Sequence, residues 1–126
     1  MSSQLNAPIS LSLACDPVYA RLVRMTAANV AMLSSMSVER VEDIRMAAEE
    51  AFIYACSTDA PDVCISFDVD DKHVGMTVSI TSDTFEASDP EDRTQAYAEL
   101  ILAGVCDSYQ KLEGPARLVL SIEADV

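Results

Sequence analysis

The sequence predicts an α+β fold, a two-layer α/β sandwich in which helices cover one face of a mixed, mostly antiparallel sheet. Short segments of alternating apolar and polar residues indicate strands, and longer segments with apolar residues three and four positions apart indicate helices. These segments follow one another in the order β-α-α-β-β-α-β. No linker divides residues 1–126, so we expect one domain.

The first strand and the first helix are predicted within residues 8–36. Residues 8–14 alternate apolar and polar side chains, which is typical of a half-buried strand, and an unpaired strand edge invites pairing. Asp16 supplies an N-cap and Pro17 suits the first helical position. Apolar residues then recur at helical spacing, so the helix is expected to reach about Met36.

A second helix is predicted over residues 38–56, with Ser37 as its N-cap. Five apolar residues at helical spacing predict its buried stripe. They are Val41, Ile44, Ala48, Phe52 and Ala55.

The remaining chain predicts a β-hairpin, a polar loop, a third helix and a last strand. The hairpin covers residues 63–70 and 73–80, the loop residues 81–90, and the last strand residues 117–123. Asp89-Pro90 repeats the Asp-Pro pair seen before, so we expect the third helix to begin there. Its expected buried face consists of Tyr97, Leu100, Ile101, Gly104 and Val105.

The charge balance disfavours several classes of partner. The chain has 21 Asp and Glu against 8 Lys and Arg, which gives a net charge of −13. An acidic surface repels phosphate backbones and anionic lipids, so we expect no nucleic-acid and no membrane partner. A basic protein partner fits this charge, and so does the plainer interpretation that the acidic side chains keep the domain soluble.

Cysteine usage and the first residues indicate the compartment. We see no basic leader before a long apolar run, and we expect a cytoplasmic protein without disulfides. The four cysteines are scattered and the single histidine is His73, so no metal site is expected. Each cysteine lies in an apolar segment, where a small buried side chain is its expected role.

Residues 41–56, VEDIRMAAEEAFIYAC, resemble the helix that carries the ATP-contacting motif in the GHKL ATPase superfamily. The resemblance is closest to bacterial anti-sigma factors with serine kinase activity, and Glu50-Ala51 and Ala55 match the motif's frame. Similar patterns at residues 9–31 and 99–122 extend it over nearly the whole chain. It implies a GHKL-like (Bergerat-like) fold, a role in transcription regulation, a sigma factor or anti-sigma antagonist as partner, and a homodimer paired through the sheets.

The resemblance also assigns positions to an ATP site, beginning on the second helix. In the family a glutamate polarises the attacking hydroxyl, and an asparagine four residues later helps to hold Mg²⁺. Here Glu50 keeps the first position and Tyr54 occupies the second. A phenol does not replace an amide oxygen as a ligand for Mg²⁺, which prefers small, hard oxygen donors.

The two other nucleotide motifs are altered as well. The family's adenine-binding Asp-x-Gly falls on Ser82 and Thr84, with Asp83 one position away. Its phosphate-binding Gly-x-Gly falls near Ala96 and Ala98, where no bare backbone is available to approach a phosphate. Residues 73–92 contain no lysine or arginine, and the family's ATP lid is reduced to about residues 81–90.

Two functions remain open at this stage. One is a regulatory protein-binding domain that neither binds nor uses ATP, with no cofactor and no catalytic residue. The other is an active ATP-dependent serine kinase with Mg·ATP as cofactor and Glu50 as base. In plainer interpretations Glu50 is a solvated carboxylate, Tyr54 is an ordinary half-buried aromatic residue, and the acidic residues 83–92 form a solvated loop rather than a surface for a basic partner.

Four methionines have two interpretations. Methionine fills irregular gaps in cores, and it also forms adaptable binding surfaces. Core filling is the favoured interpretation here, and a partner surface is the alternative. The residues are Met25, Met32, Met36 and Met46.

Overall fold

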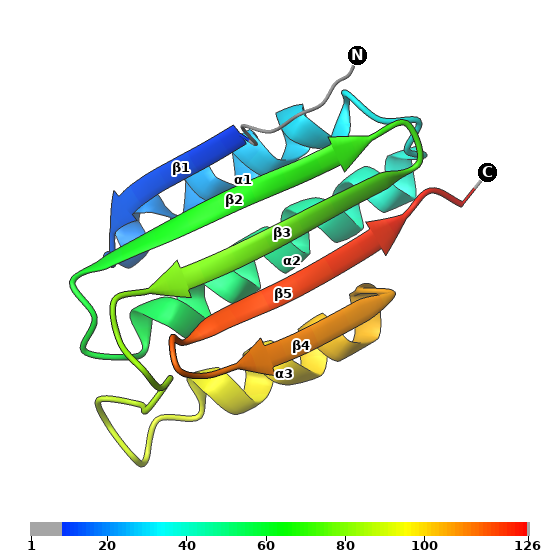
Figure 1. Ribbon diagram of the computed structural model, residues 1–126. Coiled ribbons are helices and arrows are strands. Elements are labelled where there is room, and N and C mark those ends of the chain that lie inside the picture. The colour runs from blue at the N-terminus through cyan, green and yellow to red at the C-terminus, as the bar shows by residue number, and fades with distance from the viewer. Residues whose placement is uncertain (1–8, 126) are drawn as a thin grey trace.

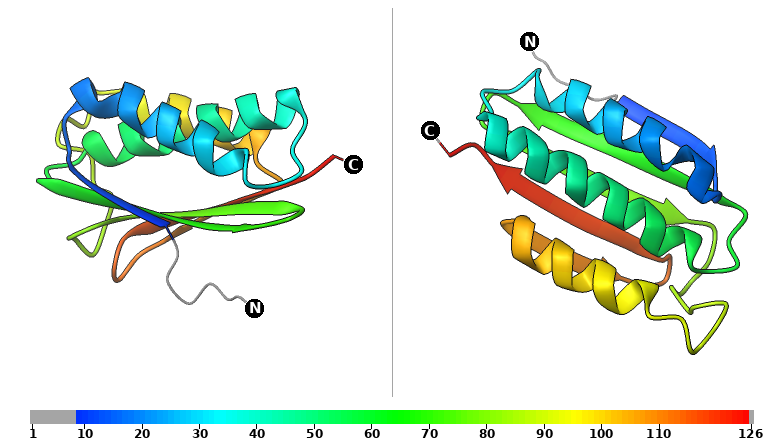
Figure 2. Two further views of the ribbon diagram at one scale, coloured as in Figure 1. Left: turned by 90° about the horizontal axis from the view of Figure 1, so that it is seen from above. Right: turned by 180° about the vertical axis from the view of Figure 1, so that it is seen from behind.

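Helices cover one face of an open sheet in the computed structural model, which describes residues 9–125 (Figure 1). The views in Figure 2 show that α1, α2 and α3 lie side by side on the same face, and this confirms the two-layer α+β architecture. The elements are β1 (Ile9–Ala14), the 3-10 turn η1 (Pro17–Tyr19), α1 (Ala20–Ala31), α2 (Val38–Cys56), β2 (Asp62–Asp70), β3 (His73–Ile80), α3 (Thr94–Val105), β4 (Ser108–Leu112) and β5 (Arg117–Glu123).

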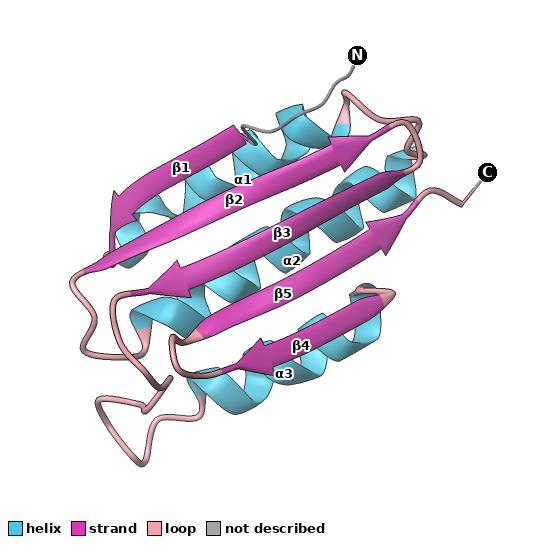
Figure 3. Cartoon of the chain, in the orientation of Figure 1, coloured by secondary structure: helices cyan, strands magenta, loops and turns pink. Residues whose placement is uncertain are grey.

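The sheet has five strands in the order β1-β2-β3-β5-β4 (Figure 3). Every pairing in it is antiparallel, so the expectation of a mixed sheet is wrong for the described residues. The β2–β3 hairpin turns at Asp71-Lys72 as predicted, with Asp70 paired to His73. Two edges remain open, at β1 and at β4.

The predicted order β-α-α-β-β-α-β lacks one strand, because β4 follows α3 directly. Cys106 takes an extended backbone conformation (φ −88°, ψ 143°), which ends α3, and the Asp107 amide then donates to the Ser121 carbonyl at 2.9 Å. The β4–β5 turn places Gly114 at φ +67°, a conformation that favours glycine. β4 is only five residues long and has one aliphatic residue, Leu112, so its alternation gives little signal in the sequence.

Two helix starts test the Asp-Pro signature. Asp16 accepts a hydrogen bond from the Val18 amide at 3.0 Å, but the chain first makes η1 and then α1, which ends at Ala31 rather than near residue 36. Asp89-Pro90 starts a turn, closed by the Asp92 amide on the Asp89 carbonyl at 3.0 Å. The third helix begins four residues later, at Thr94. Pro fixes a backbone angle that suits turns as well as helices, which explains the error.

The helix α2 matches its prediction most closely. Ser37 caps it by accepting a hydrogen bond from the Arg40 amide at 3.2 Å. The predicted stripe is buried against the sheet, with Val41 packed at its margin. In α3, by contrast, Ala98 and Leu102 are the buried residues, while Tyr97, Leu100 and Gly104 are exposed. This helix is apolar nearly all round, so helical spacing alone could not select its inward face.

The two faces of the sheet differ in chemistry. Toward the helices, β5 presents Leu118, Leu120 and Ile122, all buried. On the other face it presents Val119 and Ser121, which are half-buried although no helix covers them. The predicted homodimer, in which sheets pair, stays a prediction; the open edge of β1 is compatible with it.

Adjacent residues of β5 test this asymmetry. Leu120→Ala is expected to lower the free energy of unfolding by about 2–5 kcal/mol, because it leaves a cavity under the helices. Val119→Ala, on the uncovered face, is expected to cost less than about 1 kcal/mol. Urea denaturation of both variants measures the difference. If both variants lose the same free energy of unfolding, or if the loss for Val119→Ala changes with protein concentration, this face of the sheet is covered in solution.

Candidate functional site

The positions assigned to an ATP site lie around the C-terminal half of α2. Glu50 and Tyr54 are on α2, Ser82, Asp83 and Thr84 follow β3, and Ala96 and Ala98 are on α3. The segment between β3 and α3 runs beside the end of α2, as Figure 1 shows. The structure therefore brings these three regions together, although the individual side chains do not converge on a common cavity.

Tyr54 occupies the place between these regions. Its side chain is fully buried, and its ring meets that of Phe85 edge to face, with 5.2 Å between the centroids. The hydroxyl donates a hydrogen bond of 2.9 Å to the Glu99 carboxylate. Burial, and then this carboxylate, raise the pKa of the Tyr54 phenol. A neutral, buried phenol thus stands where the resemblance would place a metal ligand.

Lys111 of β4 completes the surroundings of Tyr54. Its ammonium lies 5.6 Å from the centroid of the Tyr54 ring and 3.8 Å from the Glu99 carboxylate. Tyr54, Glu99 and Lys111 form a linked set, which we call the Tyr54 cluster. Neither Glu99 nor Lys111 is predicted as a site residue from the sequence. Glu99 lies on α3, whose inward face has no clear pattern, and only pairing of β4 with β5 brings Lys111 to this position.

Hydrogen bonds join the segment after β3 to the residues that follow α2. The Ser88 amide and hydroxyl both donate to the Ser57 carbonyl, at 2.9 and 3.1 Å, and Ala87 forms a β-bridge with Thr58. Gln95 donates to the Ser57 hydroxyl at 2.9 Å and to the Phe85 carbonyl at 2.7 Å. These bonds hold Phe85, which is buried, against Tyr54.

The positions assigned to adenine and phosphate have ordinary surroundings. Ser82 and Asp83 are exposed, and their carbonyls accept hydrogen bonds from Ala116 and Gly114 at 2.8 and 2.9 Å. Thr84 is also exposed, and its amide donates to the Ser82 hydroxyl at 3.4 Å. On α3 the two positions differ, because Ala98 is buried and Ala96 is exposed.

A hollow of about 510 Å³ lies beside Ser82 and Thr84. Its charged side chains are Asp59 and Glu86, and no lysine, arginine or glycine lines it. Phosphate sites need cationic side chains or free backbone amides, so this hollow does not suit a triphosphate. The remaining lining residues are Thr58, Ala60, Pro61, Thr81, Ala87, Ser88 and Pro90.

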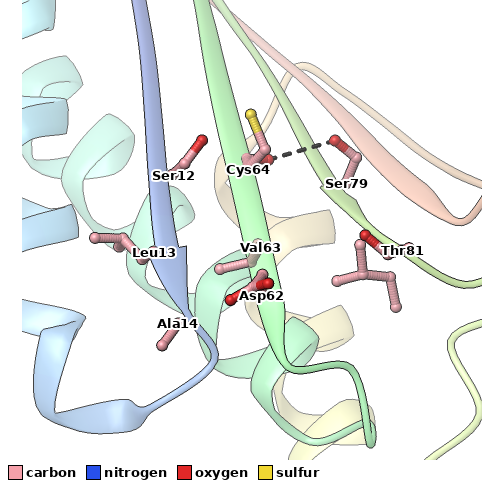
Figure 4. A pocket seen from close by; sticks show the side chains of 9 residues that line it. Ser12, Leu13, Ala14, Asp62, Val63, Cys64, Ser79 and Thr81 are labelled. Carbon is pink, nitrogen blue, oxygen red and sulfur yellow. Dashed lines mark hydrogen bonds between the residues drawn. The ribbon is translucent and has the colours of Figure 1, made fainter.

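A second hollow, of about 480 Å³, lies at the ends of β1, β2 and β3. Ser12, Cys64 and Ser79 come from the three strands and point to the same side of the sheet (Figure 4). The Ser79 hydroxyl donates to the Cys64 carbonyl at 3.5 Å. Asp62 is the one charged residue in this lining. Its carboxylate forms no hydrogen bond with the hydroxyl of Ser12 or Ser79, so these residues do not form a pair of base and nucleophile.

Glu50 stands apart from the Tyr54 cluster. It is half-buried, and burial, then the neighbouring Glu49 carboxylate, raise its pKa. Glu49 itself is paired with Arg24 at 3.0 Å. A carboxylate with a raised pKa suits a base, and Glu50 forms no ion pair with the described residues.

No protein-family model and no curated protein sequence matches this chain. In residues 9–125 no helix has both the length and the apolar character to cross a membrane. The same residues contain no group of three or more His, Cys, Asp or Glu placed to hold a metal ion. The four cysteines are free and half-buried.

Two tyrosines differ in the partners of their hydroxyl groups. Tyr54→Phe is expected to lower the free energy of unfolding by about 1–2 kcal/mol, because it removes a hydrogen bond to a carboxylate. The buried Tyr109 hydroxyl has no hydrogen-bond partner among the described residues, so Tyr109→Phe should leave stability unchanged or raise it. Urea denaturation compares the variants. A larger loss for Tyr109→Phe would contradict the described hydrogen bonding.

The raised pKa of Glu50 predicts a pH-dependent effect. Glu50→Gln should raise the melting temperature at pH 7, where the carboxylate is ionised and disfavoured in the folded state. This gain should shrink as the pH falls through the folded pKa and vanish below the unfolded value of about 4.3. Melting curves at pH 7 and pH 4 test it. As a control, Glu49→Gln should lower stability at pH 7, since it breaks the ion pair with Arg24.

Proposed function

We propose that this chain is a regulatory protein-binding domain of the GHKL anti-sigma type that acts without ATP. One observation carries the proposal: the Tyr54 ring is buried and held by Phe85, Glu99 and Lys111, and the resemblance would put a metal ligand at this residue. A fold that retains its architecture but has lost its ligand groups keeps its surfaces for binding other proteins. A cytoplasmic location belongs to this proposal.

The energetic argument concerns three missing contacts. Tyr54 replaces a magnesium ligand, Ser82 and Thr84 replace the adenine motif, and alanines replace the phosphate-binding glycines. Each charge-assisted hydrogen bond lost costs about 1.5–3 kcal/mol, and about 1.4 kcal/mol is tenfold in affinity. Three losses would weaken a micromolar nucleotide site by several powers of ten.

The second candidate function is an active serine kinase with Glu50 as base. One observation favours it, namely that the pKa of Glu50 is raised, as suits a proton acceptor. This function would require Tyr54 to leave its buried position and break its bond with Glu99 before Mg·ATP could bind. It also lacks cations, because the hollow beside Ser82 has an acidic lining.

The proposed partner is a sigma factor or an anti-sigma antagonist. A tagged form of the domain can be co-expressed with each such protein of its own genome and then purified. Co-purification of one of them in a stoichiometric complex, with no nucleotide added, supports the proposal. Capture of none, in repeated trials with both classes, counts against it.

Mg·ATP at millimolar concentration is expected to leave the melting temperature unchanged relative to magnesium alone. Stabilisation by a ligand grows with its concentration over Kd, so even a weak site would raise the melting temperature. Tyr54→Asn supplies the missing amide but should not restore binding, because the other two motifs remain altered. A rise of several degrees with Mg·ATP in the unmodified protein would reject the proposal in favour of the kinase.

A further inference from the structure

Three of the four methionines considered above are on the surface. Met25, Met32 and Met46 are exposed to 51%, 74% and 43%, and Met36 is half-buried against the core. The interpretation as core filling is therefore wrong for the three exposed residues. Exposed methionines on neighbouring helices need another explanation, and an adaptable binding surface is the alternative that the sequence left open.

A hollow of about 360 Å³ lies where α1 leads into α2. Its lining is mostly apolar, and Met32 and Val38, two of its members, are exposed to 74% and 80%. The next residue along the chain from Met32, Leu33, is also exposed. We call this hollow the α1–α2 groove, and it is lined by Met32, Ser34, Met36, Val38, Val41 and Glu42.

Carboxylates lie beside the α1–α2 groove. The Ser35 hydroxyl donates to Asp71 at 3.0 Å, and the Ser37 hydroxyl donates to Asp125 at 2.8 Å. These bonds bring the β2–β3 turn and the C-terminal end beside the groove, and the three segments meet at one end of the molecule in both Figure 1 and Figure 2. Glu39, in the first turn of α2, adds a further exposed carboxylate.

The arginines near the groove are engaged with other carboxylates. Arg40 pairs with Asp43 at 3.4 Å and with Asp107 at 3.3 Å. Arg45 pairs with Glu42 at 2.6 Å. The arginines thus neutralise carboxylates on α2 and in the α3–β4 connection rather than Asp71 or Asp125. Lys72 adds one positive charge in the β2–β3 turn, where its carbonyl accepts a hydrogen bond from the Ala124 amide at 2.8 Å. Asp71, Asp125 and Glu39 outnumber this single lysine, so the border of the apolar groove is acidic on balance.

We propose that the α1–α2 groove binds a basic amphipathic segment of a partner protein, with apolar side chains in the groove and lysine or arginine beside Asp71, Asp125 and Glu39. This inference rests on the proposed function and names its surface. A second copy of this chain fits less well, because both copies would carry a net charge of −13. Apolar anchors in a methionine-lined groove, flanked by charge of opposite sign, are a recurring mode of helix recognition.

The test uses a defined probe, a synthetic helical peptide of leucine and lysine of about 18 residues, or five turns. A matched peptide has glutamate in place of lysine. With ¹³C-labelled methionine methyl groups, the lysine peptide should shift the signals of Met32 and Met36. Met76, which is buried in the core, is the internal control and should not move. The glutamate peptide should shift none of them.

Paired substitutions then separate the groove from general electrostatic attraction. Met32→Gln with Val38→Gln should weaken binding of the lysine peptide about tenfold or more, because apolar anchors dominate such interfaces. Tyr97→Gln with Leu100→Gln removes two apolar side chains of similar exposure, 66% and 71%, from α3, and should change the affinity less than about twofold. Equal effects of the two pairs, or larger effects on α3, would overturn the proposal.

The same variants distinguish this proposal from the proposed function. If a sigma factor or antagonist co-purifies with both paired variants equally well, the proposed function stands and the groove is the wrong surface. If Mg·ATP binds the unmodified protein, the proposed function fails, while the peptide result still decides the groove. If methionine signals shift on concentrating the protein without peptide, the groove binds a second copy and the proposal is wrong.

Discussion

The packing of α2 against the sheet is the interaction on which the rest of the structure depends. The helix lies between α1 and α3 and contacts β2, β3 and β5 below it (Figure 2). Its inward stripe is fully buried at Ile44, Ala48, Phe52 and Ala55. Burial of such a stripe contributes more to the stability of the helix than helix propensity does. Residues of α2 take part in both the Tyr54 cluster and the α1–α2 groove.

Several contacts of different kinds hold Tyr54 in place. Tyr54 points sideways from α2 toward α3, where Glu99 accepts its hydrogen bond and Phe85 packs on its ring. Each of these contacts stabilises the packing of Phe85 and α3 against Tyr54, and the hydrogen bonds between Ser57 and Ser88 add to this stability. A ligand would have to replace all of them together. If the chain acts without ATP, as proposed, the Tyr54 cluster would supply contacts in the place of a bound nucleotide.

Elements with a strong pattern could be predicted from the sequence, and elements defined by pairing could not. The cap at Ser37, the stripe of α2 and the β2–β3 hairpin each have a local signal, and the structure confirms them. β4 has none, because a short polar edge strand becomes a strand through its bonds to β5. For the same reason Lys111 could not be placed in the site. The predicted inward face of α3 is wrong at Tyr97, Leu100 and Gly104, which are exposed, while Ile101 and Val105 are half-buried. The helix is apolar over most of its surface, so tertiary packing decides which side faces inward.

The acidic charge and the exposed apolar side chains of this protein have opposite effects on self-association. Exposed Met32 and Val38 would favour self-association, and a net charge of −13 opposes it, because two copies repel before their apolar surfaces meet. The same charge would attract the basic segment that we propose for the α1–α2 groove. Both effects act over a Debye length of about 8 Å at physiological ionic strength. Rising salt weakens the attraction and the repulsion together but leaves apolar burial intact, so it shifts the balance from basic partners toward self-association.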